Sequence, residues 1–269
     1  MTSETSTDAA HQKPPAAVWA RGLVRRFGKS TAVDGLDLDI APGEFYGLLG
    51  QNGAGKTTTI KMIVGLLRPT EGTAGIGEHA TWEDPIAVKR RIGVLPEEFN
   101  LYERLTGAEL LDFTAAMHGL EREETISRRN ELLEMLDLTE DSTKLVGDYS
   151  RGMRKKVALA ASIIHRPDVL FLDEPFEGVD AVSARLIQQL LIRYTESGAT
   201  IVFSGHEMHL VERLCTRVGI MVKGRLAVED TVTGLCERTG MDNVEDAFIS
   251  AVGGEVGTGE VGWLHNSPS

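Results

Sequence analysis

GQNGAGKT, residues Gly50 to Thr57, is the segment from which the architecture of this chain can best be read. It has the spacing G-x-x-x-x-G-K-[ST] and lies between an apolar run, Phe45 to Leu49, and a run with helical periodicity, Thr57 to Leu67. A glycine loop that joins a strand to a helix can direct successive backbone N–H groups, and the positive end of the helix, at phosphate oxygens. The sequence therefore predicts a phosphate-binding loop within an α/β fold.

Each residue type in this loop has a physical role in binding a nucleoside triphosphate. Glycines let the backbone turn tightly and approach the anion without a Cβ in the way. Lys56 is expected to place its ammonium group on the β- and γ-phosphates, the Thr57 hydroxyl to bind Mg²⁺, and Thr58 to assist at the α-phosphate. The alternative, a glycine turn with an incidental lysine, explains the full spacing less well. The predicted nucleotide-binding residues of the loop are Gly50, Gln51, Asn52, Gly53, Ala54, Gly55, Lys56, Thr57 and Thr58.

Apolar runs of strand length recur outside the loop. Val169 to Leu172 reads VLFL and Thr200 to Phe203 reads TIVF, and neither alternates with polar residues. Strands without alternation are buried on both faces, as parallel strands usually are. Helical patterns over Val157 to Ile164 and Val182 to Thr195 lie beside these runs in the sequence. We therefore expect an α/β core with a mostly parallel sheet.

Two regions depart from this alternation of strands and helices. The stretch from Thr106 to Ser150 is dense in Leu, Glu and Arg with helical periodicity, which predicts a helical insertion. Val18 to Leu38 and Gly72 to Val94 contain short β-like runs broken by glycine, which predicts a small antiparallel layer.

The expected domain limits follow from these patterns. Residues 1–17 are expected to form a disordered tail, and residues 253–269, which are rich in glycine, a flexible one. A single folded domain is expected over residues 18–252, with a helical subdomain at about 98–165.

A pair of carboxylates follows the VLFL run directly. Asp173 and Glu174 precede Pro175 at the exit of an apolar strand, where buried charges need solvent, a metal or a proton. Ligands bind at this edge of an open α/β sheet. Asp173 is then placed to hold Mg²⁺, and Glu174 to polarise a water for attack on the γ-phosphate. Taken alone, the pair could also be an ordinary polar turn.

The composition argues against several other classes of function. The chain has 269 residues and a formal net charge of −12, and a grip on nucleic-acid backbones needs a basic face. No apolar stretch approaches the roughly 20 residues that a membrane-spanning helix needs, and the N-terminal residues lack the apolar region of a secretory signal. Cys215 and Cys236 lack zinc or redox spacing, which fits a reducing cytoplasm.

The motifs together resemble those of the ATP-binding cassette (ABC) ATPases, over roughly Val18 to Val252. The segment YSRGMRKK, Tyr149 to Lys156, is similar to the signature motif that usually reads LSGGQ in this family. Ser150 and Gly152 match that motif and would bind nucleotide, whereas Tyr149, Arg151 and Met153 depart from it. The departures resemble those of single-cassette, export-type members. The alternative is an ordinary helix start, which basic residues disfavour.

Three further positions match the family in the expected order. Asp180, in Gly178-Val179-Asp180, resembles the loop that couples the two sites of a dimer, while Glu177 and Val179 are mild departures. His206 matches the histidine that contacts the γ-phosphate and orients the water, although a lone histidine is usually structural or solvated. Phe27 matches an aromatic residue that stacks on adenine, although by itself it would be interpreted as a core residue.

Glu97 departs from the family in a way that bears on the metal. It lies in IGVLPEE, Ile92 to Glu98, where the family has a glutamine that senses Mg²⁺. A carboxylate binds Mg²⁺ more strongly than an amide does but repels a triphosphate without the metal. We expect Glu97 to keep a metal-sensing role with a sharper Mg²⁺ dependence; the alternative is a solvated loop carboxylate. The expected metal ligands are thus Thr57, Asp173 and Glu97.

The resemblance implies an ATPase of P-loop NTPase fold with ATP and Mg²⁺ as cofactors. Two cassettes would meet head to tail, as a homodimer or a paired cassette, and would drive separate transmembrane permease subunits, most simply those of an exporter. The chain would then lie peripherally at the cytoplasmic face of the membrane, and no nucleic-acid partner is expected. The segment Glu98 to Leu105, with Phe99 and Tyr102, would dock on the membrane partner or else pack within the helical insertion.

Two other functions remain open at this point: a soluble ABC ATPase outside transport, and a non-hydrolysing regulatory module. The first commonly carries a second cassette, a long coiled coil or a basic face, and the second needs neither Glu174 nor His206. The transported substrate cannot be read from this sequence.

Overall fold

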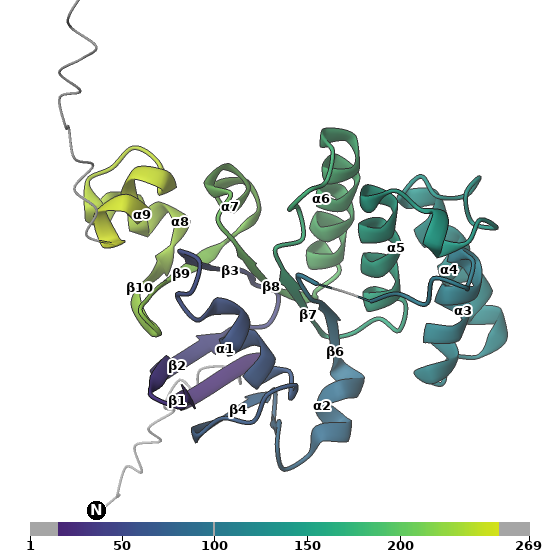
Figure 1. The fold of residues 1–269 in the computed structure, drawn as a ribbon. Helices are drawn as coiled ribbons and strands as arrows, with labels where there is room; N and C mark the ends of the chain where they lie inside the picture. The colour runs from purple at the N-terminus through teal and green to yellow at the C-terminus, as the bar shows by residue number, and fades with distance from the viewer. Residues whose placement is uncertain (1–15, 99, 253–269) are drawn as a thin grey trace, which may run out of the picture.

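The computed structural model describes residues 16–98 and 100–252, which form two sheets and the helices around them (Figure 1). The expected tails lie outside these residues, except for Ala16 and Ala17. Ala17 donates a backbone hydrogen bond to Ile40 just before the first strand. No helix in the described ranges is long and apolar enough to cross a membrane.

The larger sheet has six strands in the order β10-β9-β3-β8-β7-β6. All neighbouring pairs from β9 to β6 are parallel, and only β10 pairs antiparallel with β9. This agrees with the predicted α/β core and its mostly parallel sheet. The strands span β3 (Phe45–Gly50), β6 (Ile92–Leu95), β7 (Val169–Asp173), β8 (Thr200–Gly205), β9 (Arg217–Val222) and β10 (Arg225–Thr231).

The smaller sheet is antiparallel, with the order β2-β1-β4-β5, as the glycine-broken runs predict. Its strands are β1 (Val18–Phe27), β2 (Ser30–Ile40), β4 (Glu71–Ile76) and β5 (His79–Ala80). The second predicted range, Gly72 to Val94, is only partly right, because it also contains the helix α2 (Pro85–Arg91) and most of β6, which belongs to the parallel sheet.

Alternate side chains of the central strands supply two separate cores. Phe45 and Leu49 of β3 join the core that includes the helical insertion, whereas Tyr46 and Leu48 join the core beneath the antiparallel sheet. The two-residue period of a strand makes this division, because successive side chains point to opposite faces. Both faces of the sheet are therefore covered, which explains why its strands are apolar throughout.

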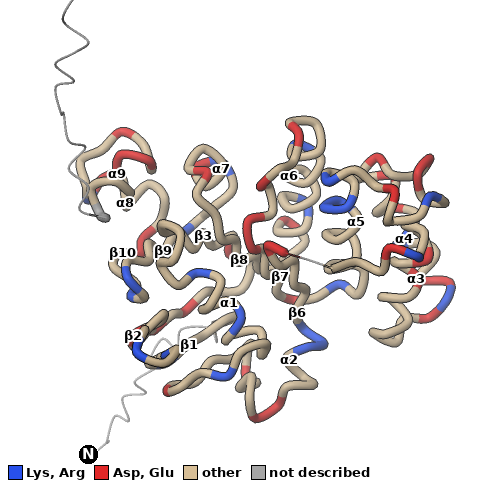
Figure 2. The backbone as a smooth tube through the Cα atoms, viewed as in Figure 1, with Lys and Arg blue, Asp and Glu red and all other residues tan. Residues whose placement is uncertain are grey.

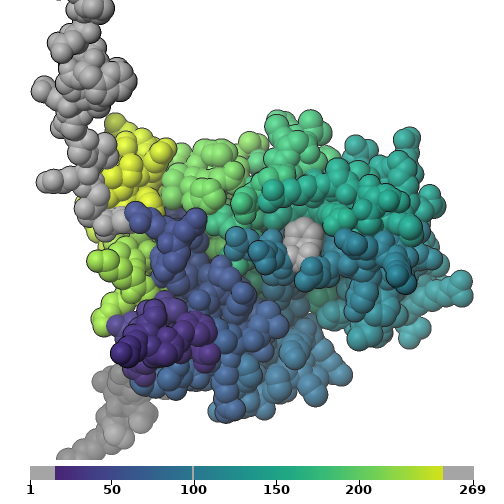
Figure 3. All heavy atoms as spheres, viewed as in Figure 1, coloured from purple at the N-terminus to yellow at the C-terminus, as the bar shows by residue number. Residues whose placement is uncertain are grey.

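The predicted helical insertion consists of α3 (Gly107–Met117), α4 (Arg122–Met135) and the short 3₁₀ turn η1 (Val146–Asp148). α3 begins at a capping box, in which the Thr106 hydroxyl accepts from Glu109 N and the Glu109 carboxylate accepts from Thr106 N. In the space-filling view the insertion, in teal, forms one side of the molecule and the C-terminal elements, in yellow and green, the other (Figure 3).

The remaining helices differ in how closely they follow the predicted helical ranges. α5 (Arg151–Ile163) begins earlier than the apolar pattern indicates, and α6 (Ala181–Glu196) agrees with its pattern. α1 (Lys56–Ile63) is shorter than predicted, since Gly65 adopts a φ of 78° that ends the helix before Leu67. α7 (Met208–Leu214), α8 (Val232–Thr239) and α9 (Val244–Val252) follow β8 and β10.

Candidate nucleotide-binding site

The glycine loop leads from β3 into α1, as the motif predicts. Gly55 is the N-cap residue of α1, with a left-handed φ of 108°, and no side chain caps the first turn. A Cβ at Gly55 would lie 2.5 Å from the Ala32 carbonyl oxygen, so a larger residue would both strain and displace the loop. The first turn of α1 consequently has no side-chain cap, and an uncapped helix start of this kind can bind an anion.

Lys56 folds back over the loop. Its Nζ donates to the Gly50 carbonyl at 2.7 Å and lies 3.9 Å from Glu174 Oε1. The side chain is 6% exposed. A phosphate oxygen can replace these partners without moving the lysine from the loop, because an ammonium group has three donors to distribute.

Four segments that are distant in sequence converge on one pocket of about 380 Å³, one of them contributing only Ala32 of β2. The glycine loop forms its floor, and Glu97 and Glu174 approach from the ends of β6 and β7. This is the carboxyl edge of the parallel strands, where an open α/β sheet binds its ligands. The pocket is lined by Ala32, Asn52, Gly53, Ala54, Gly55, Lys56, Thr57, Thr58, Glu97 and Glu174.

The two carboxylates at the end of β7 have different surroundings. Asp173 is 3% exposed, and its Oδ1 accepts a hydrogen bond from the Ser204 hydroxyl on β8. Glu174 follows in the left-handed region, with φ of 49°, and its N–H donates to the Ser204 carbonyl at 3.1 Å. The change in backbone direction at Glu174 separates the two side chains, so only Glu174 lines the pocket.

Glu174 and His206 form a close acid–base pair. Glu174 Oε2 lies 3.1 Å from His206 Nδ1, and the His206 side chain is 58% exposed just beyond β8. Burial raises the pKa of Glu174, while His206 and Lys56 act in the opposite direction. A carboxylate with a raised pKa in a cleft is suited to accept a proton, and the exposed histidine can reach a ligand as well as the carboxylate.

Ser150 and Gly152 lie at the start of α5, against the loop that carries Asp180. The Ser150 hydroxyl accepts from Met153 N at 3.2 Å, and a Cβ at Gly152 would lie 3.0 Å from Asp180 Oδ2. Asp180 in turn caps α6, and the hydrogen bond that its carboxylate accepts from the Ser183 backbone N–H lowers the pKa of Asp180. None of these three predicted residues lines the pocket around Lys56.

The departures from the signature motif have local structural reasons. Tyr149 is 5% exposed and donates its hydroxyl to the Asp141 carbonyl at 2.8 Å, so it anchors the helical insertion from within the core. The Arg151 guanidinium covers Gly178, since a Cβ there would fall 2.2 Å from Arg151 Cζ. Met153 packs at the edge of the same core as Tyr149.

Phe27 does not belong to the core. It is 48% exposed at the end of β1, and the Arg25 guanidinium lies 4.5 Å from the centre of its ring. The interpretation of Phe27 as a core residue is therefore wrong, and an exposed ring can stack on a base. It is not among the residues that line the pocket around Lys56.

The residues expected to hold Mg²⁺ offer the right chemistry but not a complete cage. Thr57 and Glu97 both line the pocket, and all three expected ligands offer oxygen, which Mg²⁺ prefers. Among the described residues, no group of three or more His, Cys, Asp or Glu side chains could hold a metal. Mg²⁺ usually completes its shell with phosphate oxygens and waters, so this donor set fits a metal that arrives with a nucleotide.

Two residues that no sequence pattern indicated hold the carboxylates in place. Ser204 bonds both Asp173 and the backbone of Glu174, and Lys155 Nζ donates to the Glu174 carbonyl at 2.9 Å. Ser204 is the fifth residue of a strand that was predicted, so its pairing with β7 could have indicated the contact. Lys155 lies in the segment that resembles the signature motif, Tyr149 to Lys156, and nothing in its sequence context indicates its partner.

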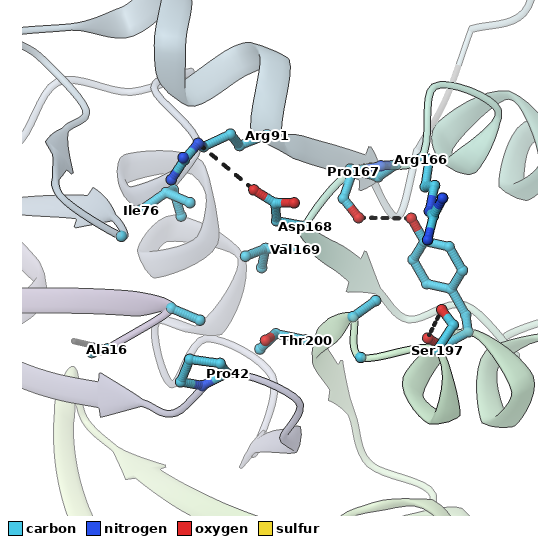
Figure 4. A pocket seen from close by; sticks show the side chains of 15 residues that line it. Ala16, Pro42, Ile76, Arg91, Arg166, Pro167, Asp168, Val169, Ser197 and Thr200 are labelled. Atoms are coloured by element: carbon cyan, nitrogen blue, oxygen red, sulfur yellow. Dashed lines mark hydrogen bonds and ion pairs between the residues drawn. The ribbon is translucent and has the colours of Figure 1, made fainter. Parts of the chain in front are cut away.

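A second hollow, of about 390 Å³, lies at the opposite edge of the sheet (Figure 4). It is bounded by Val169 and Thr200, the first residues of β7 and β8. Three charged side chains line it, and two of them, Arg91 and Asp168, form an ion pair at 3.6 Å, while the third is Arg166. Because this is the amino edge of the parallel strands, it lacks the loop and the carboxylates, and we assign no nucleotide to it.

The charges are interspersed along the described backbone (Figure 2). Lys and Arg occur on β1, α2, α4 and α5, and Asp and Glu lie between them and at the end of β7. The charged residues that line the nucleotide pocket are Lys56, Glu97 and Glu174.

Comparison with known proteins agrees with this geometry. A family model described as "ABC transporter" matches residues 33–177. The linearmycin resistance ATP-binding protein LnrL of Bacillus subtilis is 36% identical, over 87% of this chain and 75% of its own length. The fluoroquinolones export ATP-binding protein Rv2688c of Mycobacterium tuberculosis is 37% identical, over 87% of this chain and 77% of its own.

Solved structures show the same architecture. The ATP-binding subunit of an ABC transporter superposes with a TM-score of 0.83 at 27% identity, over 87% of this chain and 99% of its own. A dimeric ATP-binding cassette in a post-hydrolysis state, bound to ADP and Pi, superposes with a TM-score of 0.73 at 25% identity, over 80% of this chain and 98% of its own.

Proposed function

Since this chain belongs to the ABC transporter family, we propose that it is the ATP-hydrolysing subunit of an exporter whose membrane-spanning part is a separate chain. As an ABC ATPase it binds and hydrolyses ATP. Export is inferred from relatives whose names describe drug resistance and fluoroquinolone export. The observation that carries the proposal is the convergence of the glycine loop with Glu97 and Glu174 on one pocket.

The loop and Lys56 would bind the triphosphate. The uncapped N–H groups at the start of α1 meet the phosphate oxygens, and Lys56 exchanges the Gly50 carbonyl for the β- and γ-phosphates. Mg²⁺, held by Thr57 with Asp173 and Glu97, would neutralise charge on the phosphates. Phe27, exposed beside Arg25, would stack on the adenine.

Glu174 would act as the general base in hydrolysis. The oxygen of a water attacks the γ-phosphorus, its proton passes to Glu174 Oε2 or Oε1, and the bond from the γ-phosphorus to the bridging oxygen of ADP breaks. His206, hydrogen-bonded to Glu174, would orient the water and contact the γ-phosphate. The raised pKa of Glu174 favours this proton transfer.

A second cassette would complete the site. Ser150 and Gly152 lie outside the pocket of their own chain, at the start of α5, where Ser150 is exposed and Gly152 is buried beside Asp180. They would close over the nucleotide of a facing copy, and Asp180 would link the two sites. Dimeric cassettes among the solved relatives support this arrangement. Loss of the γ-phosphate would then loosen the pair.

The membrane partner would dock where the segment before α3, with Tyr102, meets Phe113 of α3. Tyr102 is 60% exposed and Phe113 is 42% exposed, and their rings meet edge to face 5.2 Å apart above a groove of about 760 Å³. The contact of Tyr102 with Phe113 of α3 supports packing on the helical insertion, and the exposure of its ring supports docking on a partner. Phe99, the other predicted docking aromatic, lies outside the described residues. The chain would thus sit at the cytoplasmic face of the membrane.

Glu174→Gln tests the catalytic proposal. An amide cannot accept the proton, so ATPase turnover should fall by about 10²- to 10⁴-fold while ATP still binds. The variant should then accumulate as an ATP-bound dimer, measured by light scattering on a sizing column with and without Mg·ATP. Glu207→Gln, in the loop between β8 and α7, makes the same chemical change outside the pocket lining and should retain turnover. Turnover unaffected by Glu174→Gln would contradict the mechanism.

The transport role needs a separate measurement, because a soluble ABC ATPase would hydrolyse ATP equally well. The tagged wild-type chain, purified gently in detergent, should carry with it a chain with several membrane spans. Complexes that contain only water-soluble proteins would favour the non-transport function.

A further inference from the structure

Helix α5 carries two consecutive buried lysines, Lys155 and Lys156. Their exposed fractions are 3% and 5%, and burial is the main influence lowering the pKa of each. A buried ammonium group is costly unless hydrogen bonds replace its water. Lys155 Nζ donates to the Glu174 carbonyl at 2.9 Å, and Lys156 Nζ donates to the Asp137 carbonyl at 3.2 Å. The two lysines therefore bind main-chain oxygens in two different parts of the molecule.

The residues that accept these bonds share an unusual backbone conformation. Glu174 has φ of 49° and Asp137 has φ of 52°, both in the left-handed region. This region is unfavourable for a residue with a Cβ, so it persists only where the surroundings impose it. At Glu174 both neighbouring peptide groups are held, because its N–H donates to Ser204 and its carbonyl accepts from Lys155.

We propose that Lys155 is a positioning residue for ATP hydrolysis: its ammonium group fixes the left-handed backbone of Glu174 and thereby aims the carboxylate into the nucleotide pocket. The proposal rests on Glu174 being the general base of the proposed function. With the backbone fixed, the side chain reaches both His206 and Lys56, at 3.1 and 3.9 Å. Released from Lys155, the peptide can relax toward an ordinary φ and carry the carboxylate away from the attacking water.

The alternative to a positioning role is a purely structural one, in which Lys155 merely fastens α5 to the core. Lys156 provides the matched control, because it is equally buried on the same helix and holds a left-handed residue of the same kind through the same type of bond. Its partner Asp137 belongs to the helical insertion and does not line the nucleotide pocket. A structural role predicts similar consequences for both lysines, whereas positioning predicts a kinetic effect only at Lys155.

Lys155→Met and Lys156→Met separate these roles, since methionine keeps much of the apolar stem and removes the donor. Lys155→Met should lower kcat for ATP by about 10- to 100-fold and leave KM within about 2-fold, because a misplaced base slows the chemical step and not binding. Lys156→Met should keep kcat within about 2-fold. Lys155→Arg, which can still donate to the Glu174 carbonyl, should recover most of the loss. Thermal unfolding of each variant verifies that the chain is folded.

Measuring Lys155→Met alone, Glu174→Gln alone and the two together distinguishes failure of this inference from failure of the proposed function. If Glu174→Gln alone remains active, the general base has been wrongly assigned. If Glu174→Gln is inactive and Lys155→Met has wild-type kcat, or if both lysine variants lose turnover equally, the positioning role is refuted. On the Glu174→Gln background Lys155→Met should cause little further loss, and a full additional loss would also refute it. Should Lys155→Met fail to fold, the kcat of Lys155→Leu, which also lacks a donor, decides between the same outcomes.

Discussion

The helices α1 and α5 both begin at a predicted phosphate contact, and they begin in opposite ways. At α1 the N-cap is Gly55, with no capping side chain, and the adjacent Lys56 is buried over the loop. At α5 the N-cap is Ser150, whose own hydroxyl accepts from Met153 N, and Ser150 is exposed whereas Gly152 is buried. The first leaves its backbone donors for a ligand, and the second already satisfies one of them internally.

This difference indicates that the two helix starts have different tasks. The start of α1 lies in a pocket with carboxylates from two other segments, so it can hold a nucleotide within one chain. The start of α5 lies outside that pocket beside Asp180, so it becomes half of a site when another surface faces it. Substitutions at α1 should therefore weaken the binding of ATP, whereas those at α5 should act at a later step.

Lys56→Ala should have the largest effect of the substitutions at these two helix starts. A charge-assisted hydrogen bond to the triphosphate is worth about 1.5–3 kcal/mol, so ATP affinity should fall by roughly 10- to 150-fold. Turnover should fall further, by about 10³-fold, because the same ammonium group stabilises charge in the transition state. Calorimetric titration with Mg·ATP and a steady-state ATPase assay measure the two quantities.

Lys61→Ala is the control for this change, since Lys61 lies on the same helix and is exposed at its last turn. It should bind and hydrolyse ATP as the wild type does. Equal affinity of Lys56→Ala and Lys61→Ala for Mg·ATP would show that the loop does not hold the triphosphate through Lys56, and the contrast between α1 and α5 would lose its basis.

The features predicted correctly from the sequence are those that local patterns encode. The glycine loop, the strand VLFL with its two carboxylates, and the helical insertion each depend on residues that are neighbours in the sequence. A loop between an apolar strand and a helix leaves few alternatives, and uniformly apolar runs of four or five residues require burial on both faces.

The features that were missed depend on contacts between distant segments. Lys155 and Ser204 reach Glu174 only after β7, β8 and α5 have packed together. Phe27 is the last residue of β1, directly before the turn at Gly28, and its exposure contradicts the alternative of a core residue while its stacking on adenine stays a prediction. The early end of α1 at Gly65 overrides a helical pattern that continues to Leu67, because a left-handed glycine ends the helix.

Ser150→Ala should affect the step after ATP binding. Loss of the cap costs about 1 kcal/mol of stability, and loss of the hydroxyl from the facing site should reduce ATP-dependent dimerisation and turnover by about 10-fold. Calorimetric affinity of the single chain for Mg·ATP should remain within about 2-fold of wild type. Dimerisation is best followed by light scattering on the Glu174→Gln background, where the ATP-bound dimer is expected to persist.

Thr106→Ala is the matched control for Ser150→Ala. Thr106 caps α3 through the same kind of bond, in which its hydroxyl accepts from Glu109 N at 3.2 Å, and it has no predicted nucleotide contact. Its loss should lower stability by a similar amount and leave dimerisation and turnover intact. If both variants lose turnover equally, Ser150→Ala acts by destabilising its helix. The start of α5 would then not form half of a nucleotide site.

Glu97→Gln should have the smallest effect, and it tests how the pocket of α1 depends on the metal. Glu97 lines that pocket with Thr57 and the loop, so its carboxylate repels a triphosphate that arrives without Mg²⁺ and attracts one that carries it. Replacing it with an amide removes both influences. The Mg²⁺ titration of ATPase activity should therefore become shallower, with the half-maximal concentration shifted by a few-fold and the maximal rate little changed. Glu98→Gln makes the same change at the next residue, which does not line the pocket, and should leave the titration as in the wild type. A titration of Glu97→Gln that coincides with the wild-type curve would make Glu97 a solvated loop carboxylate, and metal dependence would then rest on Thr57 and Asp173 alone.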